Sequence, residues 1–289
     1  MPSIEPRAVV AAAAPAASED LVDRVTTVES VAALAARVYR YRELLKNIVL
    51  KDLKLKYRGS ALGFLWSLAN PLLMIGVYAV AFNYILRVGT TGYVFRLMLG
   101  VLAWTFFANS ATMATGANVD NAALLKNVAF PRVILPFATV LFYLIQYLLT
   151  VAVFLPVMIL WYRVPLSAVM ALFIVFLVLQ VMFTTGVSLL LATSTAFFRD
   201  TRHLLEVALA VMFWTTPILY QVNQLPEGIK LAIYLSPMSS FVIAYQRLFY
   251  FGEVPEASVW AIALAYTLGM LVLGVRWSLA VEQQVMDSL

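Results

Sequence analysis

Among the residues able to do acid-base or metal chemistry, one short stretch brings a histidine together with two carboxylates. The single histidine, His203, stands in the run R-D-T-R-H over 199–203, and Glu206 follows it. A histidine beside carboxylates can act as a general acid or base, so an enzyme is one hypothesis for this chain. The competing interpretation of Asp200, His203 and Glu206 is a solvated turn held by salt bridges.

Most other chemistry is excluded by residues that the chain lacks. It has no cysteine, which removes thiolate metal sites and cysteine nucleophiles, and one histidine cannot form H-E-x-x-H. No G-x-x-x-x-G-K-[ST] run occurs, so the chain does not bind nucleotide through a P-loop. The sequence therefore predicts no metal, no catalytic residue and no cofactor in this chain.

The composition is that of a membrane protein. Of 289 residues, 63% are hydrophobic and 12% are charged, against about 25% charged in an average soluble protein. So few polar residues cannot cover the surface of a soluble globule. The chain is predicted to be an all-α integral membrane protein that crosses the bilayer several times.

Charge-free runs define the predicted spans. They cover residues 61–86, 97–119, 133–162, 164–198, 207–226, 231–246 and 257–275. Six reach or approach the roughly 20 residues that cross a bilayer, whereas 231–246 is short and contains Ser236, Pro237, Ser239 and Ser240. We expect six transmembrane helices, with a re-entrant helical pair at about 225–250 before the last span; the alternative is a seventh span.

The basic residues predict the orientation. With six spans and the N-terminus inside, 15 of the 20 Lys and Arg residues lie on the cytoplasmic side and 5 on the outer side, so both termini are expected in the cytoplasm. Residues 1–30 are rich in Ala and Pro and start without a basic segment. They are typical of a flexible cytoplasmic tail and not of a signal peptide. The spans contain no Asp, Glu or Lys, so ion coupling is not expected and energy must come from another subunit.

A basic segment precedes the first span. Residues 37–58 hold eight basic residues and two acidic ones, and Tyr41, Leu44, Leu45, Ile48 and Leu55 fall on one helical arc. This pattern predicts an N-terminal amphipathic helix over 31–58 that lies on the membrane surface and contacts a partner or a phosphorylated lipid head. The simpler alternative is a charge cluster that only fixes orientation.

The second cytoplasmic loop is also expected to be helical. Asn121 can cap a short helix that runs through Lys126, and Pro131 ends it by removing a backbone donor. Such a helix, joined rigidly to two spans, can transmit the motion of a docked partner, whereas the alternative is an ordinary connection.

Several motifs resemble one transporter family. The run K-D-L-K-L-K-Y-R-G-S-A-L-G-F-L-W-S-L-A-N-P-L over 51–72 is similar to the opening of the permease subunits of polysaccharide ABC exporters, the ABC-2 class, which carry O-antigen, capsule or teichoic acid chains. F-P-R at 130–132, L-P at 135–136, F-R-D at 198–200 and T-P-I at 216–218 recur at matching places. The resemblance covers about residues 40–280.

The resemblance implies an assembly and its working parts. It implies a homodimer bound to two separate ATP-binding cassette subunits, which use ATP and Mg, in the bacterial cytoplasmic (inner) membrane. Residues 59–289 would form the six-span domain that exports a lipid (undecaprenyl)-linked polysaccharide, with a coupling helix at about 118–129. The implied entry loop contains Arg58, Gly59, Ser60 and Gly63, and the implied ATPase-coupling residues are Asn121, Leu124, Leu125, Lys126 and Asn127.

The resemblance implies that the first and fifth spans line most of the channel, so aromatic residues in these spans are candidates for its lining. Aromatic rings offer flat faces to sugar C–H groups with little hydrogen-bond specificity, which suits a sliding glycan. The candidates are Trp66, Tyr78, Phe82, Tyr84, Phe213, Trp214 and Tyr220. For any one ring, packing or contact with lipid is the alternative, so we expect a subset to line the channel.

Two other functions remain as alternatives. One is an ABC-2 permease for a small drug or lipid, although such permeases usually lack a basic helix joined to R-G-x-x-L-G. The other is a membrane-embedded transferase acting on polyprenyl lipids, which would need the acidic and histidine residues near position 203. Besides the partner subunits and the glycan, membrane lipids are expected to contact the chain, and nucleic acid is not.

Overall fold

The computed structural model describes residues 36, 38–58, 65–85, 87, 92–122, 125 and 130–281. The chain divides into two units, residues 1–40 and 41–289. In the first unit residues 36 and 38–40 are helical, and the predicted tail, 1–30, lies outside the described residues. The second unit is helical throughout its regular structure, with no strand among its described residues.

The helices of the second unit follow the apolar runs. They are α3 (Arg42–Tyr57), α4 (Leu65–Ala79), η1 (Val80–Ile85), α5 (Tyr93–Gly116), α7 (Ile134–Tyr162), η2 (Ala168–Ala171), α8 (Leu172–Phe197), α9 (Thr201–Thr215), η3 (Val222–Gln224), α10 (Glu227–Tyr234), α11 (Ser239–Gln246), η4 (Arg247–Phe251) and α12 (Ala257–Ala280). Here η1 and η4 are π-helical, and η2 and η3 are 3₁₀-helical.

Four of these helices are long and apolar enough to cross a membrane: Tyr93–Gly116, Ile134–Tyr162, Ala168–Phe197 and Ala257–Ala280. The bent pair Gly228–Tyr234 and Ser239–Phe251 would raise the number to five if it formed one span. The predicted first and fifth spans contain α4 and α9, each 15 residues long, which rise only about 22 Å. A multi-pass helical membrane protein is therefore supported, and the count of six spans stays a prediction.

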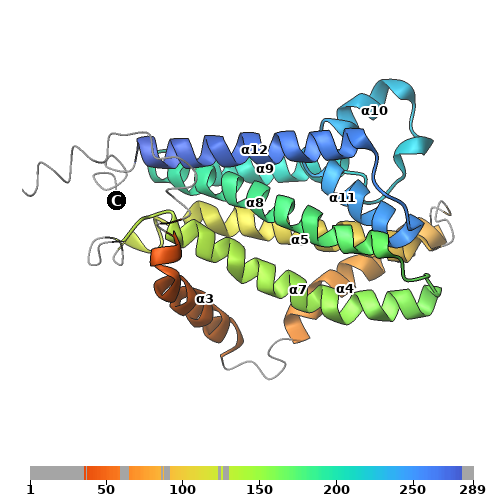
Figure 1. Ribbon diagram of the computed structural model, residues 1–289, viewed down its shortest axis with the longest axis horizontal. Coiled ribbons are helices and arrows are strands. Elements are labelled where there is room, and N and C mark those ends of the chain that lie inside the picture. Colours follow the sequence, from red (N-terminus) through yellow and green to blue (C-terminus); the bar gives the residue numbers. More distant parts are fainter. Residues whose placement is uncertain are drawn as a thin grey trace, which may run out of the picture. The chain divides into compact units, whose positions relative to one another are not determined.

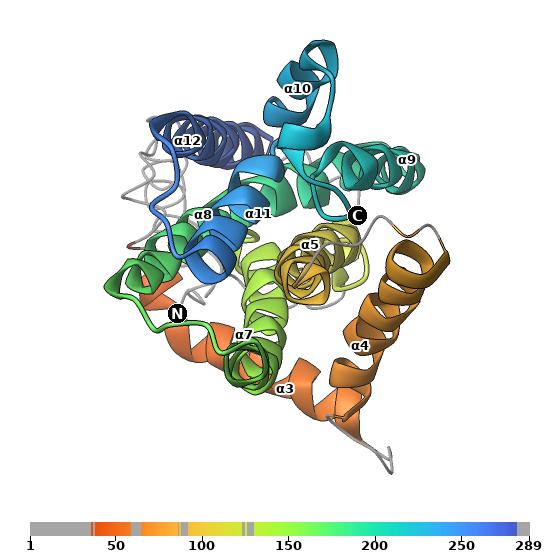
Figure 2. The same ribbon diagram turned by 90° about the vertical axis from the view of Figure 1, so that its right-hand side faces the viewer.

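Helix α5 lies at the centre of the bundle. Figure 2 shows it end-on, with α7 on one side and α9 on the other. Its residues are buried on nearly all faces, because its neighbours α4, α7, α8, α9 and α11 all contact it. Phe107 of α5 stacks on Phe183 of α8 at 5.4 Å between ring centroids, and Phe183 meets Phe241 of α11 at 5.6 Å. These rings form the middle of the core.

A buried polar network joins the same helices. The Gln180 side chain on α8 donates to the Ala103 carbonyl of α5 at 2.9 Å and accepts from the Tyr245 hydroxyl of α11 at 2.7 Å. Gln180 is fully buried, so each of its bonds replaces water that cannot reach it. The network fixes the positions of α5, α8 and α11 relative to one another.

The bundle has two ends that matter for function. At the Asp120 end, α5 finishes and α9 begins; at the α10 end, α9 finishes and α12 begins (Figure 1). Helices α10 and α11 lie at the α10 end, and the pair Gly228–Tyr234 and Ser239–Phe251 bends by 94°. The chain between α9 and α12 therefore leaves and re-enters the bundle at the same end.

Helix α3 packs against α7. Its buried residues are Leu45, Ile48 and Val49, while Leu55, which was expected on the same arc as Ile48, is 58% exposed. Instead, the next residue, Lys56, reaches α7. The helical conformation agrees with the sequence pattern, and the proposed position of this helix on a membrane surface stays a prediction.

Candidate functional site

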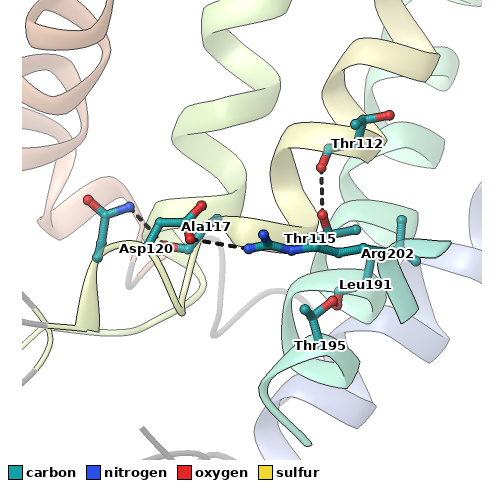
Figure 3. A network of polar contacts seen from close by, with 8 residues as sticks. Thr112, Thr115, Ala117, Asp120, Leu191, Thr195 and Arg202 are labelled. Carbon is teal, nitrogen blue, oxygen red and sulfur yellow. Dashed lines mark hydrogen bonds and ion pairs between the residues drawn. The ribbon is translucent and has the colours of Figure 1, made fainter. Parts of the chain in front are cut away.

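The loop after α5 is tied to the start of α9 at the Asp120 end. Arg202 Nη2 lies 3.1 Å from Asp120 Oδ1, forming an ion pair between residues 82 positions apart in the chain (Figure 3). The neighbouring Thr115 and Thr195 hydroxyls donate to carbonyls of their own helices, at Thr112 and Leu191. The ion pair is thus the side-chain link between the two segments in Figure 3.

Gly116 makes room for this ion pair. A Cβ at position 116 would lie 2.1 Å from Asp120 Oδ2 and 2.9 Å from Arg202 Nη2, closer than real atoms approach. Asn118 adds a second tie, because its buried amide donates to the Ala192 carbonyl of α8 at 3.3 Å. Residues 116–120 are therefore attached to both α8 and α9.

The predicted coupling residues fall partly in this loop. Asn121 Nδ2 donates to the Ala117 carbonyl at 2.9 Å, so its side chain binds the residue that ends α5, and its expected role as the cap of a following helix stays a prediction. The Asn121 carbonyl accepts from the Leu125 N–H at 3.1 Å, which makes one helical turn. Leu125 is 6% exposed and hence packs within the chain. Leu124, Lys126 and Asn127 lie outside the described residues.

Several of the predicted channel aromatics lie together. Tyr78 of α4 stacks on Phe213 of α9 at 5.8 Å between centroids, and Phe213 contacts Trp104 of α5 at 5.5 Å and Trp214 at 5.9 Å. Tyr220 joins this group through a 2.7 Å hydrogen bond from its hydroxyl to the Trp214 carbonyl. The structure thus connects α4 and α9 by aromatic contacts, and a channel-lining role for these rings stays a prediction.

The other three candidates lie elsewhere. Phe82 stacks on Tyr93 of α5 at 6.0 Å, and Tyr84 is 76% exposed near the end of η1. Trp66, at the start of α4, is 59% exposed and lines a separate cavity. That location puts Trp66 apart from the Tyr78–Phe213 group.

The cavity, here called the Lys56 cavity, lies between α3, α4, α5 and α7. Its volume is about 250 Å³, and its polar lining comprises Lys56, Asn70, Thr105, Asn109, Tyr143, Gln146, Tyr147 and Thr150. Lys56 Nζ donates to Gln146 Oε1 and lies 5.4 Å from the Phe142 ring centroid and 5.6 Å from that of Tyr143. Partial burial lowers the pKa of Lys56 below its ordinary value.

Hydroxyl groups hold α10 and α11 to the end of α9. The Thr215 hydroxyl donates to Ser236 Oγ at 3.3 Å, the Thr216 and Ser236 hydroxyls lie 3.4 Å apart, and Ser239 donates to the Thr215 carbonyl at 3.3 Å. Gln246 Nε2 donates to the Pro217 carbonyl at 3.1 Å. The T-P-I motif of 216–218 is therefore the attachment point of the bent pair.

Comparison with known proteins identifies the family. The family model of the ABC-2 type transporter matches residues 43–250, which is well over half of the chain. The chain belongs to the ABC-2 type transporter family. Its match begins within α3 and ends within η4, so it includes the Lys56 cavity, the Asp120 end and the bent pair of this transporter.

Characterised relatives of this ABC-2 transporter share a name. The O-antigen export system permease protein RfbA of Klebsiella pneumoniae is 35% identical over 213 residues, which cover 73% of the chain and 82% of that relative. The protein of the same name from Myxococcus xanthus is 33% identical over 226 residues, covering 78% of the chain and 86% of the relative. Membership of this family makes the chain a membrane transport subunit.

The remaining predicted residues of this ABC-2 transporter are exposed or lie outside the described part. Arg58 is exposed directly after α3, and Gly59, Ser60 and Gly63 lie outside the described residues. His203 Nδ1 lies 3.8 Å from Glu206 Oε2, with both side chains more than two-thirds exposed. Within the described ranges, no group of three His, Asp or Glu side chains is placed to hold a metal.

Sequence reasoning missed two features of this site. Asp120 was not linked to Arg202, although their opposite charges, just after α5 and at the start of α9, were visible in the sequence. The contact of Lys56 with Gln146 was also missed, because the pattern of residues 37–58 carries no information about the residues of α7. In both cases the partner comes from a distant helix, so local periodicity could not identify it.

Proposed function

We propose that the chain is the channel-forming subunit of an ATP-driven exporter, which moves an undecaprenyl-linked polysaccharide such as an O-antigen across the bacterial cytoplasmic membrane. The observation that carries this proposal is the similarity to relatives named as O-antigen export permeases, at 33–35% identity over 80–86% of their length. The aromatic group around Phe213 supports it, because such rings suit a sliding glycan.

The exporter works as a homodimer in this proposal. Leu205 is the one buried residue among the described residues of α9, while Leu204, Val207, Val211 and Trp214 are 59–70% exposed. On α4, Leu73 and Val77 are likewise more than 60% exposed. A second copy facing α4 and α9 would enclose the glycan path between the two chains. In this arrangement α4 with η1 and α9 complete a set of six spans.

Two ATP-binding cassette subunits supply ATP hydrolysis with Mg and dock on the loop that follows α5. Leu125, being buried, would hold this loop to its own chain and would not contact the ATPase directly. The Asp120–Arg202 ion pair would then pass movement of the docked loop to α9, whose far end carries Phe213 and Trp214.

Both termini lie in the cytoplasm in this proposal, and the bent pair of α10 and α11 is re-entrant on the outer side. The exposed residue Arg58, together with Gly59, Ser60 and Gly63, would receive the lipid pyrophosphate at the cytoplasmic face. Guanidinium binds phosphate oxygens in a bidentate manner, and glycine allows a backbone to approach an anion closely.

The proposal is tested by purifying the chain with and without the ATPase encoded beside it. The complex should hydrolyse ATP and the chain alone should not. In ATP-supplied proteoliposomes, lipid-linked glycan should cross the membrane even after the proton gradient is collapsed, since the predicted spans contain no Asp, Glu or Lys. Glycan transfer to an acceptor by the chain alone, without the ATPase, would instead favour the transferase.

A further inference from the structure

The ammonium group of Lys56, which lines the Lys56 cavity, has hydrogen-bond donors without an acceptor among the described residues. An ammonium group has three donors, and within the described parts of the chain the Lys56 ammonium has one hydrogen-bond acceptor, Gln146 Oε1. The Phe142 and Tyr143 rings lie beside it and contribute cation–π attraction but no acceptor. No carboxylate is present in the lining, so the cavity favours an anion.

Two amides face the same cavity from neighbouring helices. Asn70 of α4 and Asn109 of α5 both line it, both are exposed, and neither has a hydrogen bond to the described residues. Because both amides are exposed and have no bond to the described residues, their donors and acceptors are available to a ligand. A ligand with several acceptor oxygens could satisfy both amides and the free donors of Lys56, and a phosphate group has this pattern.

The surroundings indicate that the ligand also has an apolar part. Trp66 lies at the cavity and is 59% exposed, and on α7 the residues directly after Gln146 and Tyr147 are the exposed Leu148 and Leu149. The volume of about 250 Å³ is slightly below the roughly 300 Å³ at which pockets for small molecules begin. A polar head therefore fits inside, while attached apolar chains would lie along α4 and α7.

We propose that the Lys56 cavity binds the phosphate of an anionic lipid head group. Lys56 and the amides of Asn70 and Asn109 hold the phosphate oxygens, and Trp66 packs against the lipid beside them. The site shares α4 with the proposed glycan path, but no residue of α9, α10 or α11 lines it, and α7 and α9 lie on opposite sides of α5 (Figure 2).

The test compares two lysines of the same helix in the full-length chain. Wild type, Lys56→Gln and Lys54→Gln are reconstituted in vesicles of equal parts phosphatidylcholine and phosphatidylglycerol, extracted, and weighed by native mass spectrometry. Lys54 is exposed and does not line the cavity, so Lys54→Gln is the matched control. Lys56→Gln should retain about tenfold less phosphatidylglycerol than the control, the effect of losing one charge-assisted hydrogen bond.

Three results would overturn the proposal. The first is equal retention by Lys56→Gln and Lys54→Gln, and the second is equal retention of phosphatidylcholine and phosphatidylglycerol by the wild type. In a parallel arm with sodium phosphate in place of phosphatidylglycerol, Lys56-dependent binding of free phosphate would show that no lipid is required. The double variant Asn70→Ala, Asn109→Ala should also lose phosphatidylglycerol while keeping its elution volume; undiminished retention would contradict the assigned contacts.

Discussion

At the scale of single residues, the Asp120–Arg202 pair matters through its position more than through its energy. Both side chains are largely exposed, at 62% and 45%, and exposed ion pairs typically contribute about 0–1 kcal/mol to stability. Its loss should therefore leave the fold intact. Because it joins two loops that are far apart in the chain, its loss should impair the transmission of movement from the loop after α5 to α9.

The substitution Gly116→Ala tests this separation of stability from coupling. The new methyl group would collide with Asp120 Oδ2, so the carboxylate must move away from Arg202. We expect a several-fold loss of glycan export with little change in melting temperature, measured in proteoliposomes and by thermal unfolding. Gly269→Ala on α12 is the control, since no atom lies within 4 Å of its added Cβ.

Exchanging the charges provides an independent check on the same pair. Asp120→Arg and Arg202→Asp should each reduce export, and the double variant should recover a substantial part of it by restoring opposite charges. A double variant no better than the worse single variant would mean that the pair does not act as a unit.

Arg58 offers a residue-scale test of substrate entry. Arg58→Lys keeps the positive charge but loses the planar fork that binds phosphate in a bidentate manner. It should lower both export and the ATPase activity stimulated by lipid-linked glycan, while Lys54→Arg has little effect. Full export by Arg58→Lys would favour the interpretation that Arg58 only helps to fix orientation.

At the scale of helices, α8 and α12 form the most closely packed pair. A Cβ at Gly274 would lie 2.1 Å from the Gly186 carbonyl oxygen, and a Cβ at Gly186 would lie 2.4 Å from the Met270 carbonyl oxygen. Small residues at such a crossing let two backbones approach, which is a main source of helix association in membranes. This pair gives α5 and α11 a rigid surface to pack on.

Gly274→Ala should therefore destabilise the protein. The methyl group meets the backbone, which cannot rotate away, so the two helices must separate; overpacking of this kind costs about 1–3 kcal/mol. Thermal unfolding in detergent should show a clear fall in melting temperature. Gly269→Ala, one turn earlier on α12 and with open space, should unfold near the wild-type temperature, and equal values for the two variants would refute the packing argument.

The sequence predicts the long helices well and their ends less well. The run 133–162 corresponds to α7 and the run 164–198 contains η2 and α8, because long apolar runs without charges have few other stable conformations in a membrane. The charge-free run 97–119 begins four residues later than α5 does. Arg96 was treated as a boundary, yet α5 begins at Tyr93 and Arg96 is 3% exposed, close to the Tyr93 ring.

The sequence predicts only those parts of the candidate site whose residues lie close together in the chain. The bent pair was expected from the short run 231–246 with its serines and Pro237, and the structure shows a 94° bend there. The grouping of Tyr78 with Phe213 followed from the resemblance and not from spacing. The Asp120–Arg202 and Lys56–Gln146 contacts depend on how distant helices pack, which periodicity within one helix does not specify.

At the scale of the whole molecule, the main prediction is that the Asp120 end of the bundle faces the cytoplasm and the α10 end faces the outside. The chain has no cysteine, so single cysteines can be introduced at Gly228, exposed on α10, and at His203, exposed at the start of α9. A membrane-impermeant thiol reagent added to intact cells should label the first and not the second. Labelling of both would contradict the assignment of the α10 end to the outside and the Asp120 end to the cytoplasm.

The hydrogen bonds of the serine and threonine hydroxyls at the α10 end affect how this end can open. Ser236 and Ser239 are buried, and separating α10 and α11 from α9 without water or a ligand would leave their hydroxyls unpaired, at about 1–3 kcal/mol each, whereas Thr216 keeps its bond to the Met212 carbonyl. A sugar hydroxyl has the same donor and acceptor as a serine or threonine hydroxyl. Under the proposed function, an arriving glycan can take over these bonds one for one, so this end can open around its cargo without leaving these hydroxyls unpaired.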